Sequence, residues 1–248
     1  MNWYSILGVV ASVVLFVPII LILALKLFTY RSFIALMLYY FVTGSYNLIA
    51  QNIITVPVWL SHPLGILNNL LDAPLMLIFL TLFSTSSAMT KRITFTLLIF
   101  IAFEIIILSI YGFNVKTVKI VLGPGIAIIG VISFLFFIRN TRLAITHPKS
   151  LGKAVMISSV LLAYSIFSLV YLFFYILKTK YKQDTELVYY LVSFLSAILM
   201  TTGIFIENKR IKKLNELKHT RRELAAIYSE TKKAALKKDS LFLRTRGY

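Results

Sequence analysis

The sequence predicts an all-α integral membrane protein with seven transmembrane helices, an external N-terminus and a cytoplasmic C-terminus. Hydrophobic residues make up 59% of the 248 residues, charged residues make up 14%, and the mean hydropathy is +0.86. Soluble domains average about 45–50% apolar and about 25% charged residues. Apolar stretches of about 20 residues, the length that crosses a bilayer, also recur along the chain. Together these features exclude an ordinary soluble domain.

Seven windows are long and apolar enough to span a membrane. The third window also contains Asn68, Asn69, Asp72 and Pro74, so a re-entrant segment is the alternative there. The first window lacks a basic region before it and a cleavage site after it, and we expect it to be a retained helix. The windows are Ser5–Leu25, Phe33–Ile54, Leu64–Phe83, Ile93–Tyr111, Val118–Ile138, Ala154–Leu177 and Leu187–Ile206.

The distribution of Lys and Arg sets the expected orientation, because cytoplasmic loops carry an excess of both. The first, third and fifth loops carry eight of them, and the N-terminus and the even loops carry five. The tail after Ile206 adds 13 against five acidic residues. The odd loops and the tail are therefore expected in the cytoplasm, with the protein placed in the cytoplasmic (inner) membrane of a prokaryote.

Prolines and glycines mark two places where a span is expected to deviate from a straight helix. Pro18 lies inside the first span and predicts a kink. Gly123-Pro124-Gly125 lies near the outer end of the fifth span and predicts a bend or an unwound turn. The alternative for this triplet is a late helix start with Pro124 in the first turn.

The chain divides into a transmembrane domain, residues 1–206, and a basic amphipathic cytoplasmic tail, residues 207–248. From Ile204 to Arg246 there is neither proline nor glycine, so the last helix is expected to continue into the tail. Apolar residues recur there at helical spacing, and Lys and Arg occupy the other face. The expected partners are anionic lipids of the inner leaflet, a cytoplasmic protein, or a second copy of the chain. Nucleic acid is not an expected partner, because no base-reading motif accompanies the basic run.

Two ionisable side chains, Asp72 and Glu104, fall inside the predicted spans, where no Lys or Arg is available to pair with them. Such residues are costly in a bilayer and indicate functional sites. Asn68 and Asn69 lie one helical turn before Asp72. Asn47 and Gln51, in the preceding span, lie at a similar distance from the outer surface, roughly 12 Å in the case of Asn47 and Asp72.

We therefore expect an outward-facing pocket for a small ligand or cation. Its residues would be Asn47, Gln51, Asn68, Asp72, Tyr164, Ser168, Tyr171 and Ser193. The alternative for the amides and Asp72 is that they only hold neighbouring helices together. Tyr175, Tyr189 and Tyr190 are instead expected at the membrane interface. Glu104 has apolar neighbours one turn away, so it is either a proton site or a neutral carboxyl bonded to another helix.

Several classes of chemistry are missing from the sequence. There is no Cys, and the three His residues fall in loops or the tail, which argues against a metal site. No serine–histidine pair at one depth and no phosphate-binding glycine motif is present. We therefore expect no cofactor and no bound metal, and the sequence favours a protein that is not an enzyme.

The architecture resembles that of microbial rhodopsins and of G-protein-coupled receptors. The resemblance extends to no residue, because the seventh window lacks the lysine that would bind retinal and no Asp-Arg-Tyr triplet occurs. The expected function is receptor-like or sensor-like, with the pocket acting on the tail through the last helix. The alternatives are a carrier or proton-coupled transporter using Asp72 and Glu104, a membrane enzyme acting on a lipid, and a structural or assembly partner.

Overall fold

The computed structural model describes residues 3–84, 86–146, 150–177 and 182–245. The described residues are almost entirely helical and include no strand. They form two compact units, Met1–Glu207 and Asn208–Tyr248. The helices are α1 (Trp3–Val14), α2 (Val17–Ala24), the 3-10 turn η1 (Leu27–Thr29), α3 (Arg31–Ala50), α4 (Val58–Phe83), α5 (Ser87–Tyr111), α6 (Val115–Thr146), α7 (Leu151–Tyr171), the π-helical turn η3 (Leu172–Ile176) and α8 (Lys182–Thr245).

Among the described residues, seven helical spans are long and apolar enough to cross a membrane, as the sequence predicts. α1 and α2 together form the first span, and α3 to α8 each supply one of the others. The third span is the uninterrupted helix α4 of 26 residues rather than a re-entrant segment. It begins at Val58, six residues before the predicted window. These features make the chain a multi-pass membrane protein.

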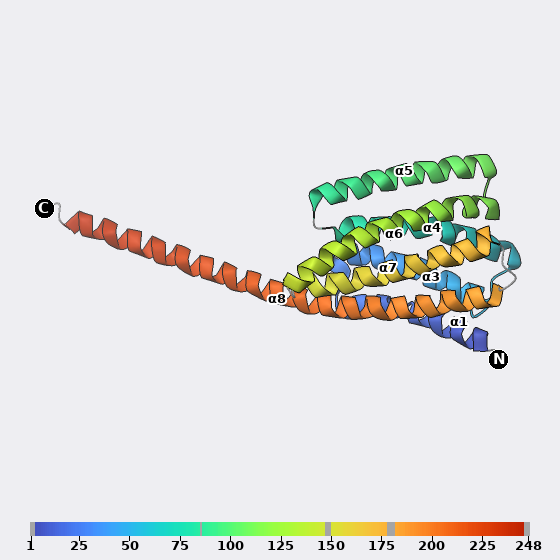
Figure 1. The fold of residues 1–248 in the computed structure, drawn as a ribbon. Coiled ribbons are helices and arrows are strands. Elements are labelled where there is room, and N and C mark those ends of the chain that lie inside the picture. The colour runs from blue at the N-terminus through green and yellow to red at the C-terminus, as the bar shows by residue number, and fades with distance from the viewer. Residues whose placement is uncertain (1–2, 85, 147–149, 178–181, 246–248) are drawn as a thin grey trace. The chain divides into compact units, whose positions relative to one another are not determined.

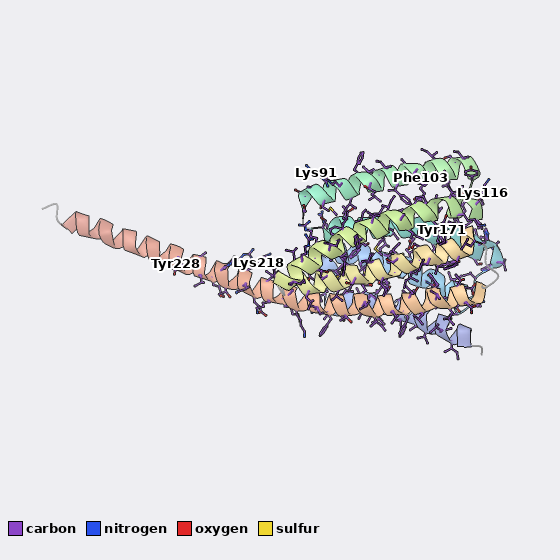
Figure 2. The ribbon with its side chains drawn as sticks, viewed as in Figure 1. Lys91, Phe103, Lys116, Tyr171, Lys218 and Tyr228 are labelled. Atoms are coloured by element: carbon purple, nitrogen blue, oxygen red, sulfur yellow. The ribbon has the colours of Figure 1, made fainter. Side chains whose placement is uncertain are left out.

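The spans lie side by side in the first unit (Figure 1). Lys116 marks the end of the bundle where α3 and α5 finish and α4 and α6 begin, and Lys91 marks the opposite end (Figure 2). We call these the Lys116 end and the Lys91 end. α5 lies at the edge of the bundle and packs against α4 and α6 (Figure 1). Because only 11% of its most apolar window is buried, the rest of its surface is available to lipid.

Pro18 interrupts the first span, as predicted. α1 ends at Val14 and α2 begins at Val17. Proline has no N–H to donate to the carbonyl four residues before it, which here is that of Val14. The ladder shifts locally, with the Phe16 N–H donating to the Val13 carbonyl at 3.0 Å.

The Gly123-Pro124-Gly125 triplet does not interrupt α6, which begins at Val115 and is helical through Thr146. Both the expected unwound turn and the alternative of a late start are therefore wrong. The glycines act in packing instead. A Cβ on Gly125 would lie 2.9 Å from that of Ala73, and one on Gly123 would lie 2.8 Å from the Tyr171 hydroxyl. The triplet lets α4 and α7 approach α6 closely.

The turn between α5 and α6 follows from two residues. Gly112 has φ +73°, a left-handed conformation that glycine adopts without steric cost after a helix. The Asn114 side chain then accepts hydrogen bonds from the Lys116 and Thr117 N–H groups at 2.8 and 3.1 Å. These contacts satisfy donors at the start of α6 that have no partner within the helix.

α7 and α8 approach each other most closely near the Lys91 end. A Cβ on Gly152 would lie 2.6 Å from the backbone nitrogen of Glu207, and one on Gly203 would lie 2.8 Å from that of Met156. Nearer the middle of the bundle, the Ser159 hydroxyl donates to the Ser196 carbonyl at 2.6 Å. Small residues of this kind allow membrane helices to pack backbone against backbone.

The second unit comprises the α8 residues from Asn208 onward. Leu214, Leu217 and Leu224 are exposed and recur at spacings of three and seven residues, so they share one helical face. His219 lies 3.1 Å from Glu223, one turn along the helix, and both side chains are exposed. Such a pair contributes little to stability. Lys218 and Tyr228, labelled in Figure 2, belong to this unit.

We predict that Gly152→Ala destabilises the bundle by about 1–3 kcal/mol, because the added methyl group meets backbone atoms of α8 that cannot move independently. The measurement is reversible unfolding in detergent. Gly130→Ala is the matched control, since a Cβ there meets nothing within 4 Å. Equal stability of the two variants would contradict the close α7–α8 packing.

Candidate functional site: a cavity around Asp72

A cavity of about 240 Å³ lies inside the first unit. It extends along α8 from Thr185 to Met200, a length of about 22 Å at 1.5 Å per residue. Tyr171, on α7 at the Lys116 end of the cavity, is labelled in Figure 2. The lining of the cavity includes Tyr39, Tyr40, Thr43, Asn68, Asn69, Asp72, Met76, Ser159, Tyr164, Phe167, Tyr171, Glu186, Tyr189, Ser193, Ser196 and Met200.

Asp72 is the central polar group of the cavity. It lies 14 residues after the start of α4 and 11 before its end, about 21 and 16 Å along the helix. Its Oδ2 accepts a hydrogen bond from the Tyr164 hydroxyl at 2.9 Å, and the Tyr39 hydroxyl is a further partner. None of the described residues lining the cavity is Lys, Arg or His. The carboxyl therefore meets hydroxyl donors but no positive charge.

Aromatic side chains form one wall of the cavity. The ring of Tyr164 contacts that of Phe167 edge-on at a centroid distance of 5.8 Å, and Phe167 stacks on Tyr189 at 5.3 Å. Tyr39 and Tyr40, from α3, meet edge-on at 5.4 Å. Edge-on and offset contacts at these distances are the favourable aromatic geometries. The wall joins α7 to α8 and faces the α4 carboxyl.

The two asparagines on α4 have different environments. The side-chain amide of Asn69 donates a hydrogen bond to the Gly65 carbonyl, one helical turn earlier, at 2.7 Å. The Oδ1 atom of Asn68 is buried and has no hydrogen-bond partner among the described residues. Asn68 lies one helical turn before Asp72, so the two side chains share a face of α4. An unpaired buried acceptor is uncommon and calls for an explanation.

Asn47 and Gln51 do not line the cavity. The Asn47 amide donates to the Tyr189 hydroxyl at 3.4 Å, and the Gln51 amide donates to that of Tyr190. They therefore connect α3 to α8. The depths inferred from sequence fail because α3 ends at Ala50 and α4 begins at Val58. Asn47 is thus about 4.5 Å from its helix end, whereas Asp72 is about 21 Å from its own.

Some of the remaining predicted pocket residues line the cavity and others do not. Tyr164, Tyr171 and Ser193 line the cavity, and the Tyr171 hydroxyl also donates to the Lys119 carbonyl at 2.7 Å. Ser168 is exposed, and its hydroxyl bonds to the Ser165 carbonyl of its own helix at 2.7 Å. Glu104 lies on α5, which does not reach the cavity.

Glu104 is a half-buried carboxyl without a hydrogen bond or ion pair among the described residues. Of its two expected roles, bonding to another helix is not seen. Phe103, the residue before it, is labelled on α5 in Figure 2. Glu104 and Asp72 are therefore separate intramembrane acids, and only Asp72 belongs to the cavity.

Sequence reasoning missed Tyr39, Thr43 and the role of Tyr189. Tyr39, Thr43 and Asn47 recur every four residues on α3, a spacing that would have identified a polar face continuing below Asn47. Tyr189, expected at the membrane interface, instead faces the cavity and stacks on Phe167. Its position near the end of a span gave no signal that distinguished the two placements.

The described residues contain no group of three or more His, Cys, Asp or Glu side chains that could hold a metal ion. No protein-family model matches the chain, and no curated protein or solved structure is significantly similar to it. The function is therefore inferred from the geometry of the cavity.

We predict that Tyr164→Phe lowers stability by about 1–3 kcal/mol, the usual range when a buried polar group loses its partner. The loss arises because one donor to Asp72 disappears while the ring is retained. Unfolding in detergent measures it, with Tyr30→Phe as the control, because that exposed side chain has no hydrogen bond among the described residues. If the two substitutions had the same small effect, the Tyr164–Asp72 bond would not be a structural restraint.

Proposed function

We propose that the protein is a receptor-like or sensor-like membrane protein that binds a small ligand beside Asp72 and relays binding to its cytoplasmic tail. The observation that carries this proposal is that one helix serves both parts. α8 lines the cavity between Thr185 and Met200 and continues to Thr245. A change in how α8 packs around a ligand would therefore act on the same element that forms the tail.

The proposed orientation places the Lys116 end outside the cell. The positive-inside rule supports it, because the loops at the Lys91 end and the tail carry most of the Lys and Arg. The connections at 147–149 and 178–181, with their basic residues Lys149, Lys178 and Lys180, lie outside the described residues. With this orientation the end of the cavity that is lined by Tyr171, Thr185 and Glu186 lies toward the outside, in the cytoplasmic membrane of a prokaryotic cell.

The close α7–α8 contact supports a relay mechanism. The aromatic wall joins the two helices beside the cavity, and Gly152 and Gly203 allow them to pack closely nearer the Lys91 end. A ligand that binds one arrangement of the helices more tightly than another shifts the population toward it. Because the close contact at Gly152 and Gly203 holds α7 and α8 together on one side of the ligand, separating the two helices at the cavity would tilt α8.

The tail is proposed to bind anionic lipid of the inner leaflet. Its exposed face of Leu214, Leu217 and Leu224 adjoins a surface rich in Lys and Arg, the composition of helices that lie on membranes. Each basic residue near such a surface contributes about 1 kcal/mol. A cytoplasmic protein or a second copy of the chain are the alternative occupants of this face.

A carrier that uses Asp72 and Glu104 together gains no support from the structure, because α5 holds Glu104 away from the cavity.

Four chains provide the test of the proposed function: wild type, Asp72→Asn, Glu104→Gln and a chain ending at Asn208. Native mass spectrometry in mild detergent is expected to find a bound small molecule in the wild type, in Glu104→Gln and in the truncated chain. Asp72→Asn is expected to lack it.

The same four chains test the relay in cells that lack the gene. Wild type and Glu104→Gln are expected to restore the phenotype, and Asp72→Asn and the truncated chain to leave it unrestored. A bound molecule that persists in Asp72→Asn would refute the site. Full restoration by the truncated chain would refute the relay while leaving ligand binding intact.

A further inference from the structure

Two hydrogen-bond acceptors in the cavity retain free capacity. Asp72 retains carboxylate lone pairs beyond its bonds with Tyr164 and Tyr39, because a carboxylate offers about four acceptor sites. Asn68 Oδ1 is buried and meets no donor within the part of the chain that the structure describes. These acceptors lie one turn apart on the same face of α4. A ligand that satisfies both must be a hydrogen-bond donor with more than one N–H or O–H.

The charge of the cavity selects among donors. Its described lining includes the carboxyl group of Asp72 and no Lys, Arg or His. A charge enclosed by membrane helices is stabilised mainly by an opposite charge, because few water molecules are present to solvate it. A cation entering the cavity is therefore attracted, and an anion is repelled.

The aromatic wall favours an organic cation over a metal ion. Tyr164, Phe167 and Tyr189 present ring surface beside Asp72, and an ammonium group near an aromatic face gains about 0.5–2 kcal/mol. Calcium instead requires 6–8 oxygen ligands, and no carboxylate cluster of that kind occurs among the described residues.

The size of the cavity restricts the ligand further. Pockets for drug-sized ligands usually have volumes of about 300–1,000 Å³, and this cavity has about 240 Å³. Met76 and Met200 line its deeper part, and methionine adapts its shape to apolar groups of different outline. A short hydrocarbon body fits this part while a charged head remains beside Asp72.

We propose that the ligand is a small protonated primary amine. Its ammonium group donates to the Asp72 carboxylate and to Asn68 Oδ1, and its short apolar body lies among the aromatic rings and the methionines. This inference rests on the proposed binding function of the cavity and names the chemical class of its ligand. Na⁺, neutral alcohols and carboxylic acids are excluded from the class.

The test is calorimetric titration of the full chain in nanodiscs with probes that share a carbon skeleton but differ in charge: butylammonium, 1-butanol and butyrate, with NaCl as the inorganic cation. Butylammonium is expected to bind saturably and the other three are not. Asp72→Asn is expected to weaken butylammonium binding at least about tenfold, the size of one charged hydrogen bond. Glu104→Gln, an intramembrane acid outside the cavity, is expected to leave the Kd within about twofold.

Asn68→Leu is the second variant, because it removes an acceptor that has no partner in the described segments and so should fold even if Asp72→Asn does not. It is expected to weaken butylammonium binding roughly three- to tenfold. Binding that is unchanged in Asn68→Leu and Asp72→Asn would overturn the proposal. So would a lack of saturable binding up to roughly 50 mM, far above the 1 mM Kd of a weak ligand.

These failures remain distinct from failure of the proposed function. If native mass spectrometry finds a neutral or anionic molecule that Asp72→Asn loses, the cavity is a binding site and the amine assignment is wrong. Asp72-dependent binding of NaCl in place of butylammonium overturns the amine assignment in the same way. If no molecule is retained and no probe binds, both proposals fail.

Discussion

The carboxyl group of Asp72, inside the bundle, determines how the helices around it are arranged. A membrane offers few groups to stabilise an enclosed charge, and the described lining of the cavity offers no Lys, Arg or His. Hydroxyl groups from two other helices meet the carboxyl instead, Tyr164 from α7 and Tyr39 from α3. These contacts bring α3, α4 and α7 around one polar group. α8 closes the cavity through Tyr189, which stacks on Phe167 of α7.

Close backbone approach at glycine holds other parts of the bundle together. Gly125 lets α6 approach α4, and Gly152 and Gly203 let α7 approach α8. Because lipid tails are as apolar as the helix surfaces, close packing and hydrogen bonds between helices replace the hydrophobic effect as the source of association. The cavity combines incomplete packing with polar groups, and this combination is what we interpret as a binding site.

The sequence predicts the spans well because each needs only composition and length. It predicts the site less well, because a site depends on which residues share a depth and a face. Asp72, Asn68, Tyr164, Tyr171 and Ser193 do line the cavity. Asn47 was misplaced because the start of α4 was assigned six residues too late, an error of about 9 Å along the helix.

Other differences have local causes. Ser168 follows the four-residue spacing of its neighbours, but the side it occupies faces out of the bundle. The glycines flanking Pro124 would unwind an isolated helix, yet here contacts with Ala73 and Tyr171 occupy the space that they leave. Neither effect can be read from one sequence, because both depend on which helices become neighbours.

Thiol labelling tests the central claim, an outward-opening cavity beside Asp72, most directly. The natural chain contains no Cys, so a single cysteine replacing Asn68 reports without background. The account predicts that a small membrane-impermeant thiol reagent labels Asn68→Cys from outside intact cells, and that Ser133→Cys, fully buried on α6 and away from the cavity, stays unlabelled. Labelling of Asn68→Cys only in inverted vesicles would contradict the orientation, and no labelling from either side would contradict an open cavity.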